Sequence, residues 1–238
     1  MESGVPLNTN RLVWKIIDWF YPPSCVECGC KGYNICPKCL SEAVPINDSF
    51  CNICGKPVNI LNGCSFCQNY KFHFTSARAA FVYEGAIRTA IKKLKYAQDL
   101  GLSELFSNFL FSIYLKEKWD VNLVTAVPLY KNRFSSRGFN QSEWIARPLS
   151  KAIGIPFSSG ALQKTIHTNP QVGLNQNERR INLQKAFQAE PAIVVKKKIL
   201  LIDDVMTTGS TFDECANTLL KAGASEVYCL SVASTVIL

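Results

Sequence analysis

The chain reads Ile199-Leu-Leu-Ile-Asp203-Asp204-Val-Met-Thr207-Thr208-Gly209-Ser210-Thr211 in its C-terminal part. The four apolar residues predict a short buried strand, with two carboxylates at its end. A run of hydroxyl side chains around one glycine then opens an amphipathic helix that ends at Gly223, a left-handed cap. The apolar face of this helix is expected to contain Phe212, Cys215, Ala216, Leu219 and Leu220.

Each part of this stretch suits a phosphorylated sugar. Backbone N–H groups at a helix start bind phosphate with the help of the helix dipole, and the surrounding hydroxyls add donors. Asp203 and Asp204 can accept hydrogen bonds from the vicinal hydroxyls of a ribose and can influence a nearby metal ion. The alternative is an ordinary strand, turn and helix with polar caps. Neither a Gly-x-x-x-x-Gly-Lys phosphate loop nor a Gly-x-Gly-x-x-Gly dinucleotide turn is present.

The stretch resembles the motif with which type I phosphoribosyltransferases bind phosphoribosyl pyrophosphate (PRPP). In that family two acidic residues bind the ribose 2′- and 3′-hydroxyls, and the Thr/Gly loop binds the 5′-phosphate. The resemblance implies an α/β fold with a parallel, Rossmann-like sheet, and it implies Mg²⁺ as the ion that accompanies PRPP. The PRPP-binding residues that it implies are Asp203, Asp204, Thr207, Thr208, Gly209, Ser210 and Thr211.

A second signal lies near the N-terminus, where eight of the eleven cysteines form four Cys-x-x-Cys pairs. Two residues between thiolates let both sulfurs face one ion, so two pairs make a four-sulfur zinc site. A disulfide framework is the alternative, but no secretory signal precedes the cysteines and Cys215 and Cys229 resemble unpaired core residues. We expect one or two structural zinc ions bound by consecutive pairs, with the ligands Cys25, Cys28, Cys36, Cys39, Cys51, Cys54, Cys64 and Cys67.

A chain of 238 residues is long enough for one α/β domain and a small module that is stabilised by bound metal. We expect an N-terminal amphipathic helix in 1–22, a double zinc ribbon in 23–70 and a phosphoribosyltransferase-type domain in 75–238. The first helix is too short to span a bilayer and the cysteines suit a reduced state, so the cytoplasm is the expected compartment. Residues 76–238 carry twenty Lys and Arg against thirteen Asp and Glu, which suits an anionic substrate or nucleic acid.

Alternating elements support the α/β class. Strands are expected at 77–83, 121–127, 198–202 and 226–232, and helices at 87–96, 102–115 and 142–153. A basic loop with Arg133 and Arg137 follows the second strand and can contact a pyrophosphate. A polar segment from Lys164 to Phe187 has no obvious core face and suits a lid over a reactive sugar, with Gln171, Arg179 and Arg180 as candidates.

Four cysteine pairs, Arg137-Gly-Phe-Asn-Gln141, the Pro170-Gln171…Arg179-Arg180 segment and the acidic stretch together resemble the ComF family over nearly the whole chain. That family is similar to amidophosphoribosyl and purine phosphoribosyltransferases and is associated with DNA uptake in bacterial natural transformation. One departure is Lys164, which stands where an Arg is expected, and a Lys cannot bind phosphate in a bidentate manner.

The resemblance implies PRPP as a ligand, with single-stranded DNA and other DNA-uptake proteins as further partners. Three functions stay open at this point: a phosphoribosyltransferase that supports DNA uptake, a non-catalytic PRPP-sensing adaptor that binds single-stranded DNA, and a nucleobase-salvage phosphoribosyltransferase. In the enzymatic cases an acceptor would displace pyrophosphate from ribose C1, mainly through positioning and electrostatics. No general base can be named, because the acceptor is unknown.

Overall fold

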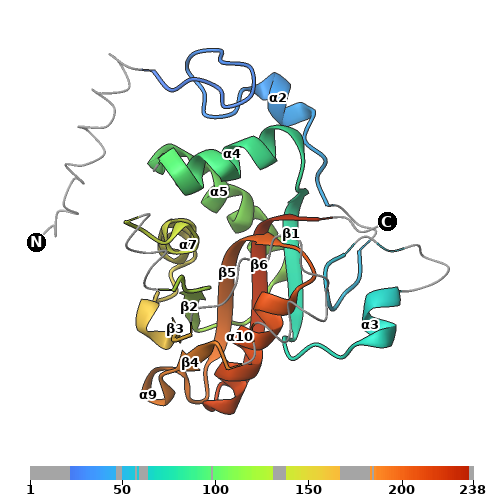
Figure 1. Ribbon diagram of the computed structural model, residues 1–238, viewed down its shortest axis with the longest axis vertical. Coiled ribbons are helices and arrows are strands. Elements are labelled where there is room, and N and C mark those ends of the chain that lie inside the picture. Colours follow the sequence, from blue (N-terminus) through green and yellow to red (C-terminus); the bar gives the residue numbers. More distant parts are fainter. Residues whose placement is uncertain are drawn as a thin grey trace, which may run out of the picture.

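A parallel four-stranded sheet forms the centre of the protein (Figure 1). The computed structural model describes residues 22–46, 50–56, 58, 64–97, 99–130, 138–166, 183 and 185–235. The strand order is β1-β6-β5-β2, and every neighbouring pair is parallel. The parallel-sheet α/β class expected from the sequence is confirmed. The strands are β1 (Ser76–Val82), β2 (Leu123–Ala126), β5 (Lys198–Met206) and β6 (Glu226–Ser234).

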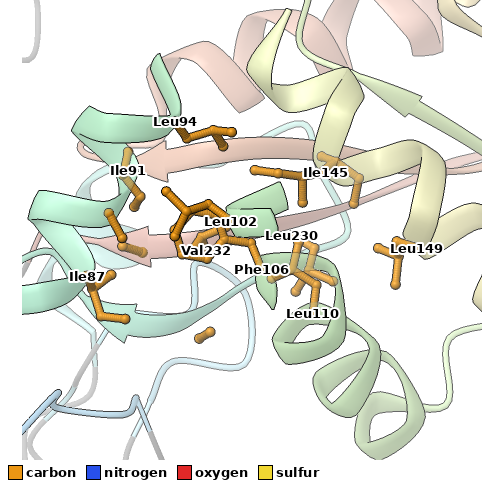
Figure 2. Packing of buried hydrophobic residues seen from close by; sticks show 14 of the residues in the cluster. Ile87, Ile91, Leu94, Leu102, Phe106, Leu110, Ile145, Leu149, Leu230 and Val232 are labelled. Carbon is orange, nitrogen blue, oxygen red and sulfur yellow. The ribbon is translucent and has the colours of Figure 1, made fainter. Parts of the chain in front are cut away.

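Three helices cover one face of the sheet: α4 (Gly85–Ala97), α5 (Leu100–Glu117) and α7 (Gln141–Ile153). Their apolar stripes meet side chains of β5 and β6 in one cluster, which Figure 2 shows from close by. Burial of such side chains contributes about 1.5–3 kcal/mol each. The fully buried members of this cluster include Ile87, Ile91, Leu94, Leu102, Phe106, Leu110, Ile145 and Leu149.

A second apolar cluster lies on the other face, under α10 (Ser210–Lys221). Phe212, Cys215, Ala216 and Leu219 of α10 are buried in it, as the helical spacing predicts, and Leu220 packs partly against it. Three short elements also contribute to this cluster: α9 (Pro191–Val194), β3 (Leu162–Lys164) and β4 (Phe187–Ala189). β3 follows the 3-10 turn η1 (Ser159–Ala161) and pairs with β4 in an antiparallel manner.

Two sequence expectations are wrong. The core strand does not stop at Ile202, because β5 continues to pair with β6 as far as Met206 opposite Ser234. The acidic pair therefore lies inside the strand and not at its end. The segment expected to lack a core face also has one at its C-terminal end, where Leu183, Ala186 and Phe187 are buried.

The edge strand β1 is covered by the chain that joins the two cysteine regions. Ile46 N–H donates to the Ala80 carbonyl at 3.0 Å, and Val82 N–H donates to the Val44 carbonyl at 2.8 Å. The edge position of this strand agrees with the sequence interpretation. The helix expected in 1–22 falls almost entirely outside the described residues. Within the described ranges, no helix is long and apolar enough to cross a membrane.

Candidate functional site

The eight cysteines form two separate four-sulfur sets. The first contains Cys25, Cys28, Cys36 and Cys39, and the second contains Cys51, Cys54, Cys64 and Cys67. In each set the sulfur atoms lie within 4.8 Å of one another, and all eleven cysteines of the chain are free of disulfides. The pairs are thus consecutive, as expected.

The sulfur spacing fits a structural zinc ion. With Zn–S bonds of about 2.3 Å, a tetrahedron places its sulfurs about 3.8 Å apart. The Sγ–Sγ distance is 3.6 Å between Cys28 and Cys36, and it is 3.4 Å between Cys54 and Cys64. Each set has a one-turn helix beside it, α2 (Pro37–Ser41) in the first and α3 (Ser65–Asn69) in the second. Four thiolates leave no open position for a substrate, so the sites serve the fold.

The two sets lie against different faces of the sheet. Cys25, Cys36 and Cys39 belong to the apolar cluster of α4, α5 and α7, whereas Cys54 belongs to the cluster under α10. Figure 1 shows α2 close to α4, with α3 at a separate place. The second set is therefore the one that shares a core with the helix following the acidic pair.

The acidic pair is held by two side chains from other elements. Asp204 is 4% exposed, and its Oδ2 lies 2.8 Å from Nζ of Lys95, near the end of α4. Asp203 is partly exposed, and its Oδ1 accepts a hydrogen bond of 2.8 Å from the Ser142 hydroxyl at the start of α7. The two carboxylates therefore have partners on two different helices, α4 and α7.

Electrostatics differ between the two carboxylates. Burial and the adjacent charge of Asp204 raise the pKa of Asp203 from 3.8 to about 7, against the opposing effects of Ser142 and Lys95. Burial of Lys95 works against its charge, but the carboxylate of Asp204 raises the pKa of Lys95 overall. Lys95 and Asp204 thus form an ion pair, and Asp203 is the carboxylate whose charge is easily changed.

The hydroxyl-rich loop joins β5 to α10. Gly209 is the N-cap of α10 with φ 82°, a left-handed conformation that favours glycine, and Ser210 N–H donates to Thr208 Oγ1 at 3.4 Å. Thr208 Oγ1 and Ser210 Oγ are 2.7 Å apart. A helix start preceded by hydroxyls is an arrangement that can bind an anion.

The described part of the basic loop supports α7. Asn140 caps the helix by accepting from Ser142 N–H at 3.1 Å, and its Nδ2 donates to the Val127 carbonyl at 3.0 Å. Phe139 stacks on Trp144 at 4.0 Å. Lys164 lies with its Nζ 5.5 Å from the ring centre of Phe187. The remaining candidates Arg133, Arg137, Gln171, Arg179 and Arg180 lie outside the described residues.

Three residues near the site were not predicted from the sequence: Lys95, Ser142 and Lys56. Lys95 lies in the helix expected at 87–96, where nothing in the sequence singled it out. Lys56 is 3% exposed and donates from Nζ to the Thr207 carbonyl at 2.9 Å, across 151 positions of sequence. A lysine directly after the Cys54-Gly55 turn was the only local signal for it.

The chain thus joins a parallel-sheet α/β domain, which has an acidic pair before a hydroxyl-rich loop, to two four-cysteine sites, and its class is that of a zinc-ribbon α/β protein. Residues 16–69 match the family model described as a double zinc ribbon domain. The chain is 31% identical to the DNA utilization protein YhgH of Escherichia coli O157:H7, over 83% of this chain and 90% of that protein. It is 30% identical to the competence protein ComFC of Streptococcus pneumoniae, over 83% and 86%. The chain belongs to the ComF family.

Other similarities are more distant. The chain is 26% identical to the competence protein F of Haemophilus influenzae, over 81% of this chain and 93% of that protein. Among solved structures, it is similar to the glutamine PRPP amidotransferase of B. subtilis (TM-score 0.42, 19% identity, 59% of this chain and 30% of that one). It is also similar to a purine phosphoribosyltransferase of Pyrococcus horikoshii (TM-score 0.35, 14% identity, 57% and 76%).

Proposed function

We propose that the chain binds PRPP with Mg²⁺ where β5 runs into α10, and that this site serves DNA uptake. The observation that carries the proposal is the fixed acidic pair, with Asp203 held by Ser142 and Asp204 by Lys95, shortly before a hydroxyl-rich helix start. Asp203 and Asp204 accept from the ribose hydroxyls, and Thr207 to Thr211 surround the 5′-phosphate.

We further propose phosphoribosyl transfer at this site. An acceptor nucleophile attacks ribose C1, the bond from C1 to the pyrophosphate oxygen breaks, and pyrophosphate leaves with the electron pair. Mg²⁺ would reduce the charge of the pyrophosphate. Arg133 and Arg137 would stabilise the leaving group, while the segment with Gln171, Arg179 and Arg180 would exclude water. Because the acidic pair orients the sugar, most of the rate enhancement would come from positioning.

The binding test is calorimetry with Mg²⁺ and PRPP. We expect Asp203→Ala with Asp204→Ala to abolish binding and to leave the zinc content unchanged, because the cysteine sites do not include these carboxylates. The control is Asp120→Ala, which removes a carboxylate that is 87% exposed and should bind as the wild type does. Unchanged affinity in the double variant would refute the assignment. Pyrophosphate release that requires an added nucleobase or other acceptor would establish turnover.

One observation favours a second candidate, a PRPP-binding adaptor for single-stranded DNA. Arg88, Lys92 and Tyr96 follow one another at intervals of four along α4, and all three are exposed, Tyr96 to 73%. A stripe of two cations and an aromatic ring suits a nucleic-acid strand. Binding of single-stranded DNA should weaken with salt, and Arg88→Ala with Lys92→Ala should reduce the salt dependence by about two phosphate contacts. DNA binding that is identical in this variant would exclude the stripe.

A further inference from the structure

The second cysteine set contacts the loop of the proposed PRPP site through Lys56. This residue follows Cys54 and Gly55, and its buried ammonium group donates to the Thr207 carbonyl at 2.9 Å. A peptide unit is planar and trans, so its C=O and the following N–H point in opposite directions. Lys56 therefore fixes Thr207 C=O on its own side and directs Thr208 N–H away from itself, as a phosphate-binding loop requires.

The chain that follows the last cysteine supports the same loop. A Cβ atom on Gly209 would lie 3.3 Å from the Phe72 ring and 4.0 Å from the Phe74 ring, which stack on each other at 4.7 Å. In the first turn of α10, Asp213 accepts from the Tyr70 hydroxyl and, at 2.7 Å, from His73 N–H. The loop and the start of its helix thus rest on residues that begin three positions after Cys67.

The position of Lys56 depends on the fold of the cysteine turn. Cys51 N–H donates to the Lys56 carbonyl at 2.8 Å, so this lysine is tied directly to a proposed metal ligand. The turn is docked on β1, where Ala77 N–H donates to the Ile53 carbonyl at 2.7 Å and Ser76 Oγ donates to the Asn52 carbonyl at 2.8 Å. A metal ion that closes this turn therefore also sets the direction of the lysine.

We propose that the second cysteine set controls the PRPP loop, with Lys56 as the positioning residue. When the set holds its metal, Lys56 keeps Thr207 and Thr208 in the phosphate-binding conformation. When the metal is lost, the lysine is released and PRPP affinity falls. The first set has no such role, because its cysteines belong to the apolar cluster on the opposite face of the sheet. This inference rests on the proposed function.

The first experiment is Lys56→Met, which keeps the length of the side chain and removes its donor. We expect PRPP affinity to fall by about tenfold or more, as loss of a charge-assisted hydrogen bond implies, and faster amide exchange in residues 205–213 without ligand. Lys56→Arg should restore much of both properties. Lys31→Met, at an exposed lysine of the first ribbon, is the matched control and should behave as the wild type.

The second experiment compares Cys67→Ser with Cys28→Ser. Each variant should contain about one zinc ion per chain, because one four-thiolate site is broken in each. Only Cys67→Ser should weaken PRPP binding and speed exchange in the loop. Equal effects in both variants, or wild-type exchange and affinity in Lys56→Met, would overturn the inference. If the wild-type protein does not bind PRPP, the proposed function fails, while loop exchange still decides the role of Lys56.

Discussion

The two cysteine ribbons have the same local motif but different surroundings. Gly29 and Gly55 occupy the same place after Cys28 and Cys54, and both have left-handed φ values, 77° and 65°. A Cβ on Gly29 would meet nothing within 4 Å, whereas a Cβ on Gly55 would lie 2.2 Å from the Ala77 carbonyl oxygen. The two Cys-x-x-Cys-Gly turns therefore have the same local conformation. Only the second turn packs closely against β1, the edge strand of the sheet.

The largest expected effect concerns Arg78, which joins the second ribbon to the sheet and to α5. It donates to the Asn52 carbonyl at 3.0 Å and to Glu117 Oε1 at 2.8 Å, and the two charged side chains are 9% and 14% exposed. Arg78→Met leaves Glu117 nearly buried without its cation, so we expect a loss of about 3 kcal/mol in the free energy of unfolding, measured with urea.

Two further variants separate the charge effect from the ribbon contact. Arg78→Met combined with Glu117→Gln should recover part of the loss, because no unpaired charge remains. Asn34→Ala, in the first ribbon where Asn34 lies against Gly101, should cost less than about 1 kcal/mol. A loss at Asn34 as large as that at Arg78 would contradict the difference between the ribbons.

A smaller effect is expected from the matched glycines. Gly29→Ala should cost about 1 kcal/mol, the strain of a left-handed alanine in open space. Gly55→Ala should cost at least about twice as much, because its methyl group also meets the backbone of β1. Urea unfolding together with zinc analysis measures both variants. Equal losses would mean that the second turn is not held against the sheet as described.

An effect that depends on pH is expected from Asp203, in a site that neither metal ligand set includes. Its pKa is raised in the folded protein, so the wild-type protein loses stability as pH rises from 3.8 to about 7. The Asp203→Asn variant has no carboxyl group at this position, so its stability does not fall with pH for this reason. We expect the variant to be more stable than the wild type at pH 8, with the advantage shrinking towards pH 5. Thermal unfolding between pH 5 and pH 8 measures the stability difference, with Asp120→Asn as a control at an exposed carboxylate. A stability difference that does not change with pH would argue against the raised pKa of Asp203.

Local sequence patterns were enough for much of the architecture. A continuous apolar run located β5, the helical spacing of apolar residues located α10, and the Cys-x-x-Cys spacing gave both four-sulfur sets, because each pattern is complete within a short stretch. The end of β5 was missed because its last residues are ordered by pairing with β6. β3 and β4 were missed because three-residue strands with one buried side chain each carry almost no periodicity.

The contacts around the acidic pair could not be predicted from the sequence, for a different reason. Lys95, Ser142 and Lys56 each lie more than fifty positions from their partners, and nothing in their own neighbourhoods distinguishes them from surface residues. Their partners follow from how the helices cross the sheet and from the docking of the second ribbon. The sequence motif therefore pointed to the residues of the loop but not to those that hold it in place.

The segment from Val44 to Ile46, which pairs with β1, has a consequence for self-association. An edge strand with free N–H and C=O groups is a template for strands of other molecules, and proteins commonly cover such edges. Here the segment that covers the edge belongs to the linker between the first and the second four-cysteine set. Removal of zinc would loosen both supports and uncover an apolar edge, so metal-free protein should tend to aggregate. The ribbons thus also help to keep the α/β domain monodisperse.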